Sequence, residues 1–232
     1  MPSSLPPIEL EFSRKRTRDH AALRPRAGWF GLVQWLSHWR ETRIARRALE
    51  QAGDPTLVLD MPCGSGRFWP LLAEHPTRVI LAADSSPELL ALAVTGQSPD
   101  VLDRTYTFLT SAFAIDLPDN AVESIFCLRL LQHVIDNRQR LALLREMHRV
   151  TRDTLIVSLW VDGNYKAWRR ARRDAKHAVS GSTMRAPMRC IVSRAAFAAE
   201  IQQAGFSVIA TYDAVPHYAL WRTYVLRKEP RP

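Results

Sequence analysis

Two acidic residues and a pair of glycines form the part of the sequence best suited to hold a ligand. An apolar run ends at Asp60, and the chain then turns through Gly64 and Gly66 into residues typical of a helix. Glycines are needed in such a turn because a side chain would keep the backbone N–H groups away from a ligand. Asp84 ends the next apolar run, where a carboxylate can accept hydrogen bonds from both ribose hydroxyls of an adenosine ligand. This arrangement predicts an adenosine-type site, and it also fits a nicotinamide cofactor.

Strand-like and helix-like segments alternate from residue 54 onward, which is the pattern of βαβ units and of a parallel sheet with helices on both faces. The last two strands are expected to close the sheet as an antiparallel pair. The sequence therefore predicts an α/β, Rossmann-like fold with a mainly parallel seven-stranded sheet and an antiparallel last strand. Strands are predicted over 56–60, 78–83, 106–109, 122–128, 154–159, 206–212 and 220–226, and helices over 67–74, 86–95, 138–150 and 193–204.

Four segments, in chain order, resemble the motifs of class I S-adenosylmethionine-dependent methyltransferases. LDMPCGSGRF resembles the first motif of that family, LAADSSPELL the second, and SAFAIDLPDNAVESIF the third. LLQHVIDNRQRLALLREMHRV resembles the fourth motif with its following helix. The small-molecule and ubiquinone-biosynthesis-like subgroup is the most similar. The resemblance implies S-adenosylmethionine as cofactor and methyl transfer as the reaction.

The resemblance assigns cofactor contacts to positions in all four segments. It implies that Asp60 and the two glycines surround the methionine part of S-adenosylmethionine, and that Asp84 holds the ribose. Two positions depart from the usual family pattern, because Pro62 stands where glycine is usual and Ser111 where an acidic residue is frequent. The implied cofactor-binding residues are Asp60, Pro62, Gly64, Gly66, Asp84 and Ser85, then Ser111, Ala112 and Phe113 at the adenine, and Arg129 near the sulfonium.

The residues before the methyltransferase domain divide into two segments. Residues 1–27 contain four prolines and a basic cluster, and they predict a mobile basic arm. Residues 28–53 repeat aromatic and apolar side chains at helical spacing, and they predict a helix that covers the cofactor pocket as a lid. The tryptophans and arginines of this helix also fit contact with an anionic membrane surface. Residues 54–232 are then the methyltransferase domain, with a basic insert over 160–190.

His133 is the candidate catalytic residue. An imidazole near the sulfonium can act as a general base and take a proton from a hydroxyl or amine acceptor as the methyl group moves. The alternative is a histidine that only shapes the pocket, because alignment of acceptor and sulfonium supplies much of the catalysis in this family. No carboxylates stand at metal-ligand spacing, so the sequence predicts no metal site.

The basic insert points to the chemistry of the methyl acceptor. Arg169, Arg170 and Arg173 share a face at helical spacing, which predicts a clamp for a phosphate or carboxylate. An anionic small molecule or an envelope glycolipid, such as a lipopolysaccharide precursor, fits such a clamp. A solvated charged helix is the alternative.

Two other functions stay open from the sequence. The net charge is +9, and residues 1–47 hold ten Lys and Arg against four Asp and Glu, so an anionic partner is expected near the N-terminus. Arg14 and Arg18 form an RxxxR pair, which fits a non-catalytic regulatory protein that senses a cyclic dinucleotide. The arginines also fit an RNA methyltransferase, although aromatic base-stacking motifs are lacking.

Cysteine usage and the N-terminus bear on the compartment. The three cysteines are scattered and odd in number, which argues against a disulfide framework. The first residues lack the basic start and apolar stretch of a secretory signal, and no apolar run is long enough to cross a bilayer. A cytoplasmic location is expected, with peripheral contact at the inner membrane as a further possibility. The oligomeric state is not predicted.

Overall fold

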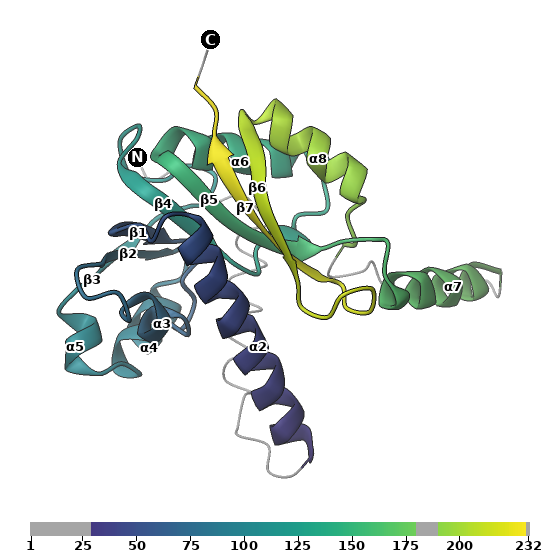
Figure 1. Cartoon of the computed structure of the whole chain (residues 1–232), viewed down its shortest axis with the longest axis horizontal. Coiled ribbons are helices and arrows are strands. Elements are labelled where there is room, and N and C mark those ends of the chain that lie inside the picture. Colours follow the sequence, from purple (N-terminus) through teal and green to yellow (C-terminus); the bar gives the residue numbers. More distant parts are fainter. Residues whose placement is uncertain (1–28, 180–189, 231–232) are drawn as a thin grey trace.

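A seven-stranded sheet lies at the centre of the chain in the computed structural model, which describes residues 29–179 and 190–230 (Figure 1). The strands are β1 (Leu57–Asp60), β2 (Val79–Asp84), β3 (Thr105–Leu109), β4 (Val122–Cys127), β5 (Thr151–Trp160), β6 (Phe206–Asp213) and β7 (Trp221–Lys228). Their order in the sheet is β3-β2-β1-β4-β5-β7-β6. Neighbours from β3 to β5 pair in parallel, whereas β7 runs antiparallel to β5 and β6. The predicted fold class is therefore confirmed.

Helices cover both faces of the sheet. One face carries α2 (Trp29–Gln51), α3 (Trp69–Leu72), α4 (Pro87–Thr95) and α5 (Pro99–Leu102), and the other carries α6 (Asn137–Val150) and α8 (Arg194–Gln203). A short 3-10 helix, η1 (Leu131–His133), follows β4, and α7 (Tyr165–Val179) follows β5. Neighbouring strand residues face opposite cores, since Val58 packs toward α2 and α3 and Leu59 packs toward α6 and α8. Among the described residues, no helix is long and apolar enough to cross a membrane.

Helix α2 is packed on the sheet only along its C-terminal half. Ala45, Ala48 and Leu49 are buried against the strands. Further toward the N-terminus, Trp35 and Trp39 are 59% and 48% exposed, and the helix extends away from the sheet (Figure 1). The helix predicted over 28–53 is therefore present, whereas the basic arm predicted over 1–27 lies outside the described residues.

Two local structures differ from the sequence-based predictions. The helix predicted over 67–74 is only the single turn α3, because the chain is still in turns as far as Phe68 and Pro70 favours the first turn of a helix. The basic insert, for which no helix bounds were predicted, begins with the helix α7. Asn164 caps that helix, since its Oδ1 accepts a hydrogen bond from the N–H of Ala167 at 2.9 Å. Residues 180–189 of the basic insert lie outside the described residues.

A buried ion pair joins the two helices on the α6 and α8 face. The guanidinium of Arg140 donates to both carboxylate oxygens of Glu200 at 3.0 and 2.6 Å. A third guanidinium nitrogen donates to the carbonyls of Val134 and Ile135, which lead from η1 into α6. Both charged side chains are less than a tenth exposed. The pair therefore ties α8 to the segment that carries the fourth motif.

Candidate functional site

The loop after β1 and the end of β2 meet at one edge of the sheet. Asp84 is 2% exposed, and its Oδ2 accepts a hydrogen bond from the backbone N–H of Gly64 at 2.9 Å. Its Oδ1 accepts from the N–H of Ser86 at 3.1 Å. Ser86 also caps α4 by accepting from the N–H of Leu89. One carboxylate thus joins the glycine loop to the start of α4, and Ser85 lies buried between them.

Asp60 and Gly66 are held by two residues whose role the sequence did not reveal. The indole Nε1 of Trp69 donates to Asp60 Oδ2 at 3.1 Å. Gly66 has a φ of +66°, and a Cβ added there would lie 2.9 Å from the Trp69 ring and 2.9 Å from Gln97 Nε2. Gln97 also donates to the Gly66 carbonyl at 3.0 Å. Glycine is therefore required at this position by the packing of the loop as well as by its backbone conformation.

Pro62 lies buried inside the same loop and follows a cis peptide bond. Because proline has no N–H group, this position offers a ligand one backbone donor fewer than glycine would. The departure from the family pattern therefore removes a backbone donor from the glycine loop.

The segment proposed for the adenine follows β3. Ser111 Oγ accepts a hydrogen bond from the N–H of Phe113 at 3.1 Å, while Ala112 between them is buried. A serine thus closes a local turn at the position where the family frequently has an acidic residue. Ser111 and Ala114 also form an isolated antiparallel bridge. The backbone of this segment is therefore held in a compact turn beside β3.

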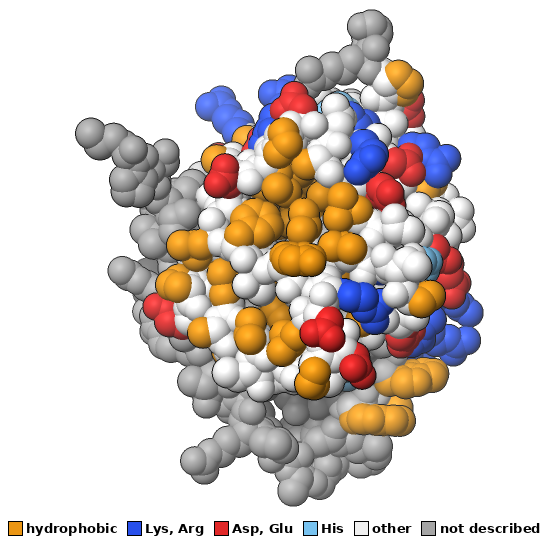
Figure 2. All heavy atoms as spheres, turned by 90° about the vertical axis from the view of Figure 1, so that its left-hand side faces the viewer, with side chains coloured by type: hydrophobic (Ala, Val, Ile, Leu, Met, Phe, Trp, Pro, Cys, Tyr) orange, Lys and Arg blue, Asp and Glu red, His pale blue; other side chains and the backbone are white. Residues whose placement is uncertain are grey.

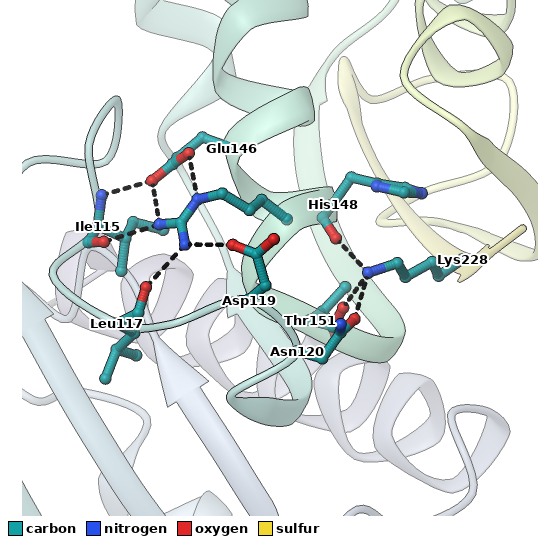
Figure 3. A network of polar contacts seen from close by, with 9 residues as sticks. Ile115, Leu117, Asp119, Asn120, Glu146, His148, Thr151 and Lys228 are labelled. Atoms are coloured by element: carbon teal, nitrogen blue, oxygen red, sulfur yellow. Dashed lines mark hydrogen bonds and ion pairs between the residues drawn. The ribbon is translucent and has the colours of Figure 1, made fainter. Parts of the chain in front are cut away.

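Polar contacts from the last turns of α6 fix the chain directly after that turn (Figure 3). Glu146 accepts from the N–H of Ile115 at 2.7 Å, and Arg149 donates to the carbonyls of Ile115 and Leu117 at 2.9 and 2.8 Å. Hydrogen bonds from Arg149 to Glu146, and then to Asp119, raise the pKa of the guanidinium above its usual value. The network anchors the adenine segment to the fourth-motif helix.

The same close-up shows how β7 is tied to the C-terminal end of α6 (Figure 3). Lys228 Nζ donates to Asn120 Oδ1 at 2.6 Å and to the carbonyls of His148 and Thr151 at 2.7 Å each. A cation is favourable there because carbonyl groups at a helix C-terminus lack partners within the helix.

Glu41 of α2 connects two loops of the candidate site. Its Oε1 accepts from Arg129 Nε at 2.6 Å, and its Oε2 accepts from one guanidinium nitrogen of Arg129 at 2.7 Å and one of Arg67 at 2.9 Å. Arg67 follows the glycine loop and Arg129 follows β4, so one carboxylate holds both loops to α2. Its side chain is 19% exposed. Sequence reasoning missed Glu41, although it is the only acidic residue between Asp19 and Glu50.

His38, one turn before Glu41, belongs to the same contact. Arg67 Nε donates to His38 Nδ1 at 2.9 Å. Partial burial lowers the pKa of His38, and the positive charge of Arg67 lowers it further. The imidazole is therefore expected to be neutral at physiological pH and to act as an acceptor.

Arg129 has an unusual backbone conformation, with a φ of +66°. Its N–H donates to Ser158 Oγ at 3.0 Å, and its carbonyl accepts from Gln132 Nε2 at 2.7 Å. Its guanidinium carbon lies 5.4 Å from the centroid of the Trp221 ring. A non-glycine residue with positive φ is strained and needs such support, and strained residues are frequent at functional sites.

His133 ends η1 directly after the buried Gln132, and it is itself half-buried. The chain returns to this point at Cys190, whose N–H donates to the Gln132 carbonyl at 2.8 Å. Burial raises the pKa of the Cys190 thiol. The end of the basic insert thus lies against the loop that contains the candidate base.

Of the three arginines predicted to bind the acceptor, Arg170 has contacts that lead to this site. Its guanidinium carbon lies 5.7 Å from the Trp160 ring centroid, and Trp160 packs edge-on against Trp221 at 5.9 Å. Trp221 in turn lies beneath Arg129. Arg169 and Arg173 are exposed on α7. The structure therefore does not bring the three guanidinium groups together at the cofactor residues, and the predicted clamp stays a prediction.

Two further predictions concern metal and dinucleotide binding. Within residues 29–179 and 190–230, no group of three His, Cys, Asp or Glu side chains is placed to hold a metal ion. Arg14 and Arg18, the basis for cyclic-dinucleotide sensing, lie outside the described residues.

Comparison with protein families places a known domain over the motifs. Residues 58–154 match the family described as "Methyltransferase domain". A methyltransferase-like protein of Schizosaccharomyces pombe is 27% identical over 190 residues, which are 75% of this chain and 64% of that protein. The chain thus spans somewhat less than two thirds of that relative.

Solved structures share the fold at low sequence identity. The magnesium protoporphyrin IX methyltransferase of Synechocystis PCC 6803, crystallised with bound SAH, has a TM-score of 0.73 and 14% identity, covering 96% of this chain and 98% of the other. A SAM-dependent methyltransferase of Methanosarcina mazei has a TM-score of 0.61 and 16% identity, covering 75% and 93%. These likenesses support the Rossmann-like fold.

Proposed function

Because the chain contains a class I S-adenosylmethionine-dependent methyltransferase domain, we propose that it methylates a small anionic acceptor or an envelope glycolipid, such as a lipopolysaccharide precursor, with S-adenosylmethionine as methyl donor. The observation that carries the assignment of the methyl donor is the buried carboxylate of Asp84, which lies against the N–H of Gly64 at the end of β2, and the cations of α7 support an anionic acceptor. An ionised carboxylate only accepts hydrogen bonds, which matches the two hydroxyl donors of a ribose.

The residues around Asp84 fit the rest of the cofactor. Asp60 and the glycine loop would hold the methionine part, where a carboxylate suits the ammonium group and glycine backbone suits the carboxylate. Ala112 and Phe113 would offer a backbone edge and an aromatic ring to the adenine. Bound S-adenosylmethionine supplies a methyl group that is electrophilic because of the neighbouring positive sulfur.

The protein's own contribution to the reaction would be alignment, exclusion of water and acceptance of a proton. The loop from Arg129 to His133 would border the acceptor, and His133 would take the proton from its hydroxyl or amine group. Helix α2, fixed to Arg67 and Arg129 through Glu41, would close the pocket as a lid.

The test for the acceptor uses the arginines of α7. Replacing Arg169, Arg170 and Arg173 together by alanine is expected to raise the KM for an anionic acceptor by at least roughly 10- to 100-fold, because the loss of even one charge-assisted hydrogen bond costs about 1.5–3 kcal/mol. Affinity for S-adenosylhomocysteine, measured by calorimetry, should stay unchanged. Arg145→Ala, an exposed arginine on α6, is the control. Equal KM values in the triple variant and the control would remove anionic acceptors from the proposal.

The test for the lid uses Glu41→Gln. The neutral amide cannot pair with both guanidinium groups, so α2 should loosen and affinity for S-adenosylhomocysteine should fall by roughly 10-fold, or about 1.4 kcal/mol. Glu50→Gln, an exposed change on the same helix, is the control. Calorimetry measures the affinity for S-adenosylhomocysteine, and limited proteolysis between α2 and β1 measures the loosening of α2. If neither the affinity nor the cleavage rate changes, α2 is not a lid held by this contact.

A further inference from the structure

Helix α2 exposes an aromatic and apolar group beyond Glu41. Trp35, Leu36 and Trp39 are 59%, 44% and 48% exposed, and their spacing places them on one side of the helix. Arg43 lies over the Trp39 ring at 5.5 Å, and Arg40 is exposed beside it. Two exposed tryptophans one turn apart are unusual on a soluble surface, because a Trp side chain is largely buried in most proteins.

Helix α7 exposes a second group of the same composition. Tyr165 and Trp168 are 47% and 54% exposed, and Tyr165 stacks on Tyr218 of the β6–β7 loop at 5.7 Å. The Nζ of Lys166 lies 5.0 Å from the Tyr218 ring centroid, and the guanidinium carbon of Arg172 lies 4.8 Å from that of Trp168. Between Tyr165 and Asp174 the helix carries five cations and one acid, and the cations are Lys166, Arg169, Arg170, Arg172 and Arg173.

A series of contacts connects the two groups through Arg129 of the candidate site. Glu41 of α2 binds Arg129, and Arg129 lies over Trp221. Trp221 packs on Trp160, and Arg170 of α7 lies over Trp160. Both helices therefore adjoin the carboxyl edge of β4 and β5, and both extend beyond the sheet (Figure 1). A surface that engaged both groups would lie next to the acceptor site.

We propose that the exposed groups of α2 and α7 form a binding surface for an anionic phospholipid bilayer. Indole and phenol rings prefer the headgroup boundary, where an apolar body and a polar tip are both accommodated. Arginine and lysine side chains beside them can reach lipid phosphates while their stems stay on the apolar layer. This proposal goes beyond methyl transfer and rests on surface residues outside the cofactor loop.

The ring contacts favour a bilayer over a single-stranded nucleic acid. Bases stack on free aromatic faces. Here one face of Trp39, Trp168 and Tyr218 is already covered by a cation, and Tyr165 and Tyr218 cover one another. Insertion at a headgroup boundary needs only the exposed edge of a ring, so the ring contacts seen here permit such insertion.

Another exposed apolar face provides a matched control. Figure 2 shows hydrophobic side chains gathered on the side of the molecule that carries β3 and α4. Tyr106 and Leu109 on β3 are 61% and 57% exposed, and Leu92 and Val94 on α4 are 46% and 39% exposed. Exposure there matches that of α2 and α7, but Tyr106, the aromatic residue among the four, has no cation over its ring among the described contacts. This face should not bind an anionic bilayer.

The experiment is co-sedimentation of the full chain with phosphatidylcholine vesicles, with and without phosphatidylglycerol. We expect binding only to the anionic vesicles, and we expect Trp39→Ala with Trp168→Ala to weaken it about tenfold or more. Tyr106→Ala with Leu109→Ala should bind as the parent does. The proposal would be overturned if the chain did not bind anionic vesicles, or if both double variants lost the same amount of vesicle binding. Tighter binding to single-stranded RNA than to vesicles would also overturn it.

Calorimetry with S-adenosylhomocysteine on the same samples separates this inference from the proposed function. A chain that binds vesicles but no S-adenosylhomocysteine would refute methyl transfer and leave the bilayer surface intact. A chain that binds S-adenosylhomocysteine but no vesicles would refute the bilayer surface and leave methyl transfer intact. Thermal unfolding of each variant shows that a lost signal does not come from a lost fold.

Discussion

Replacing Asp84 by asparagine is expected to lower the affinity for S-adenosylhomocysteine by roughly 100-fold, or about 2.8 kcal/mol. In the native chain its two oxygens accept from the N–H groups of Gly64 and Ser86. An amide has one oxygen, so its NH₂ group would face one of these donors and push the glycine loop away from α4. The ribose would also lose a charged acceptor. Isothermal titration near neutral pH measures the effect.

Asp103→Asn, an exposed change after α5, is the matched control and should bind as the parent does. A melting curve for the Asp84→Asn variant shows whether it is folded at the titration temperature. A folded variant with native affinity would mean that Asp84 only closes the loop and does not contact the cofactor.

Breaking the ion pair between Arg140 and Glu200 is expected to produce the largest loss of stability. Glu200→Ala leaves a guanidinium that is buried beneath α8 without its carboxylate, and removal of one partner of a buried pair costs about 3–5 kcal/mol. For a domain of this size the midpoint of thermal unfolding should fall by roughly 6–20 °C. Circular dichroism at increasing temperature measures it.

A double replacement separates charge burial from packing. Arg140→Met combined with Glu200→Leu removes both charges and keeps apolar volume, so it should recover most of the lost stability. Arg145→Ala, exposed on α6, should leave the melting temperature unchanged. If Glu200→Ala has the same midpoint of thermal unfolding as the parent, the ion pair does not hold α8 to α6.

The glycine loop after β1 could be predicted from sequence because its determinants are local. Gly64 and Gly66 adopt positive φ, and the carboxylates stand at the ends of apolar runs, so residue type and order suffice to locate them. The helix predicted over 86–95 is likewise present as α4, which Ser86 caps and Pro87 begins. These features depend on a few neighbouring residues.

Contacts between distant segments could not be predicted in the same way. Glu41 meets Arg67 and Arg129 across 26 and 88 positions of the chain. An acid among the arginines of α2 was the only signal, and it does not say which arginine it will meet. The hydrogen bond from Trp69 to Asp60 could not be predicted, because a tryptophan after a glycine loop is equally typical of a buried core residue.

The amino-acid sequence by itself determined the alternating α/β fold, the order of the motifs and the position of the glycine loop between β1 and α3, because hydrophobic periodicity and turn chemistry act over a few residues. Only the tertiary structure decided that Glu41 holds α2 to two loops of the candidate site and that Arg170 alone of the three predicted arginines contacts the ring series beside Arg129. It also decided that α2 and α7 expose aromatic and basic side chains. The physical reason is that such contacts depend on how the helices pack against the sheet, which brings together residues that no local pattern relates.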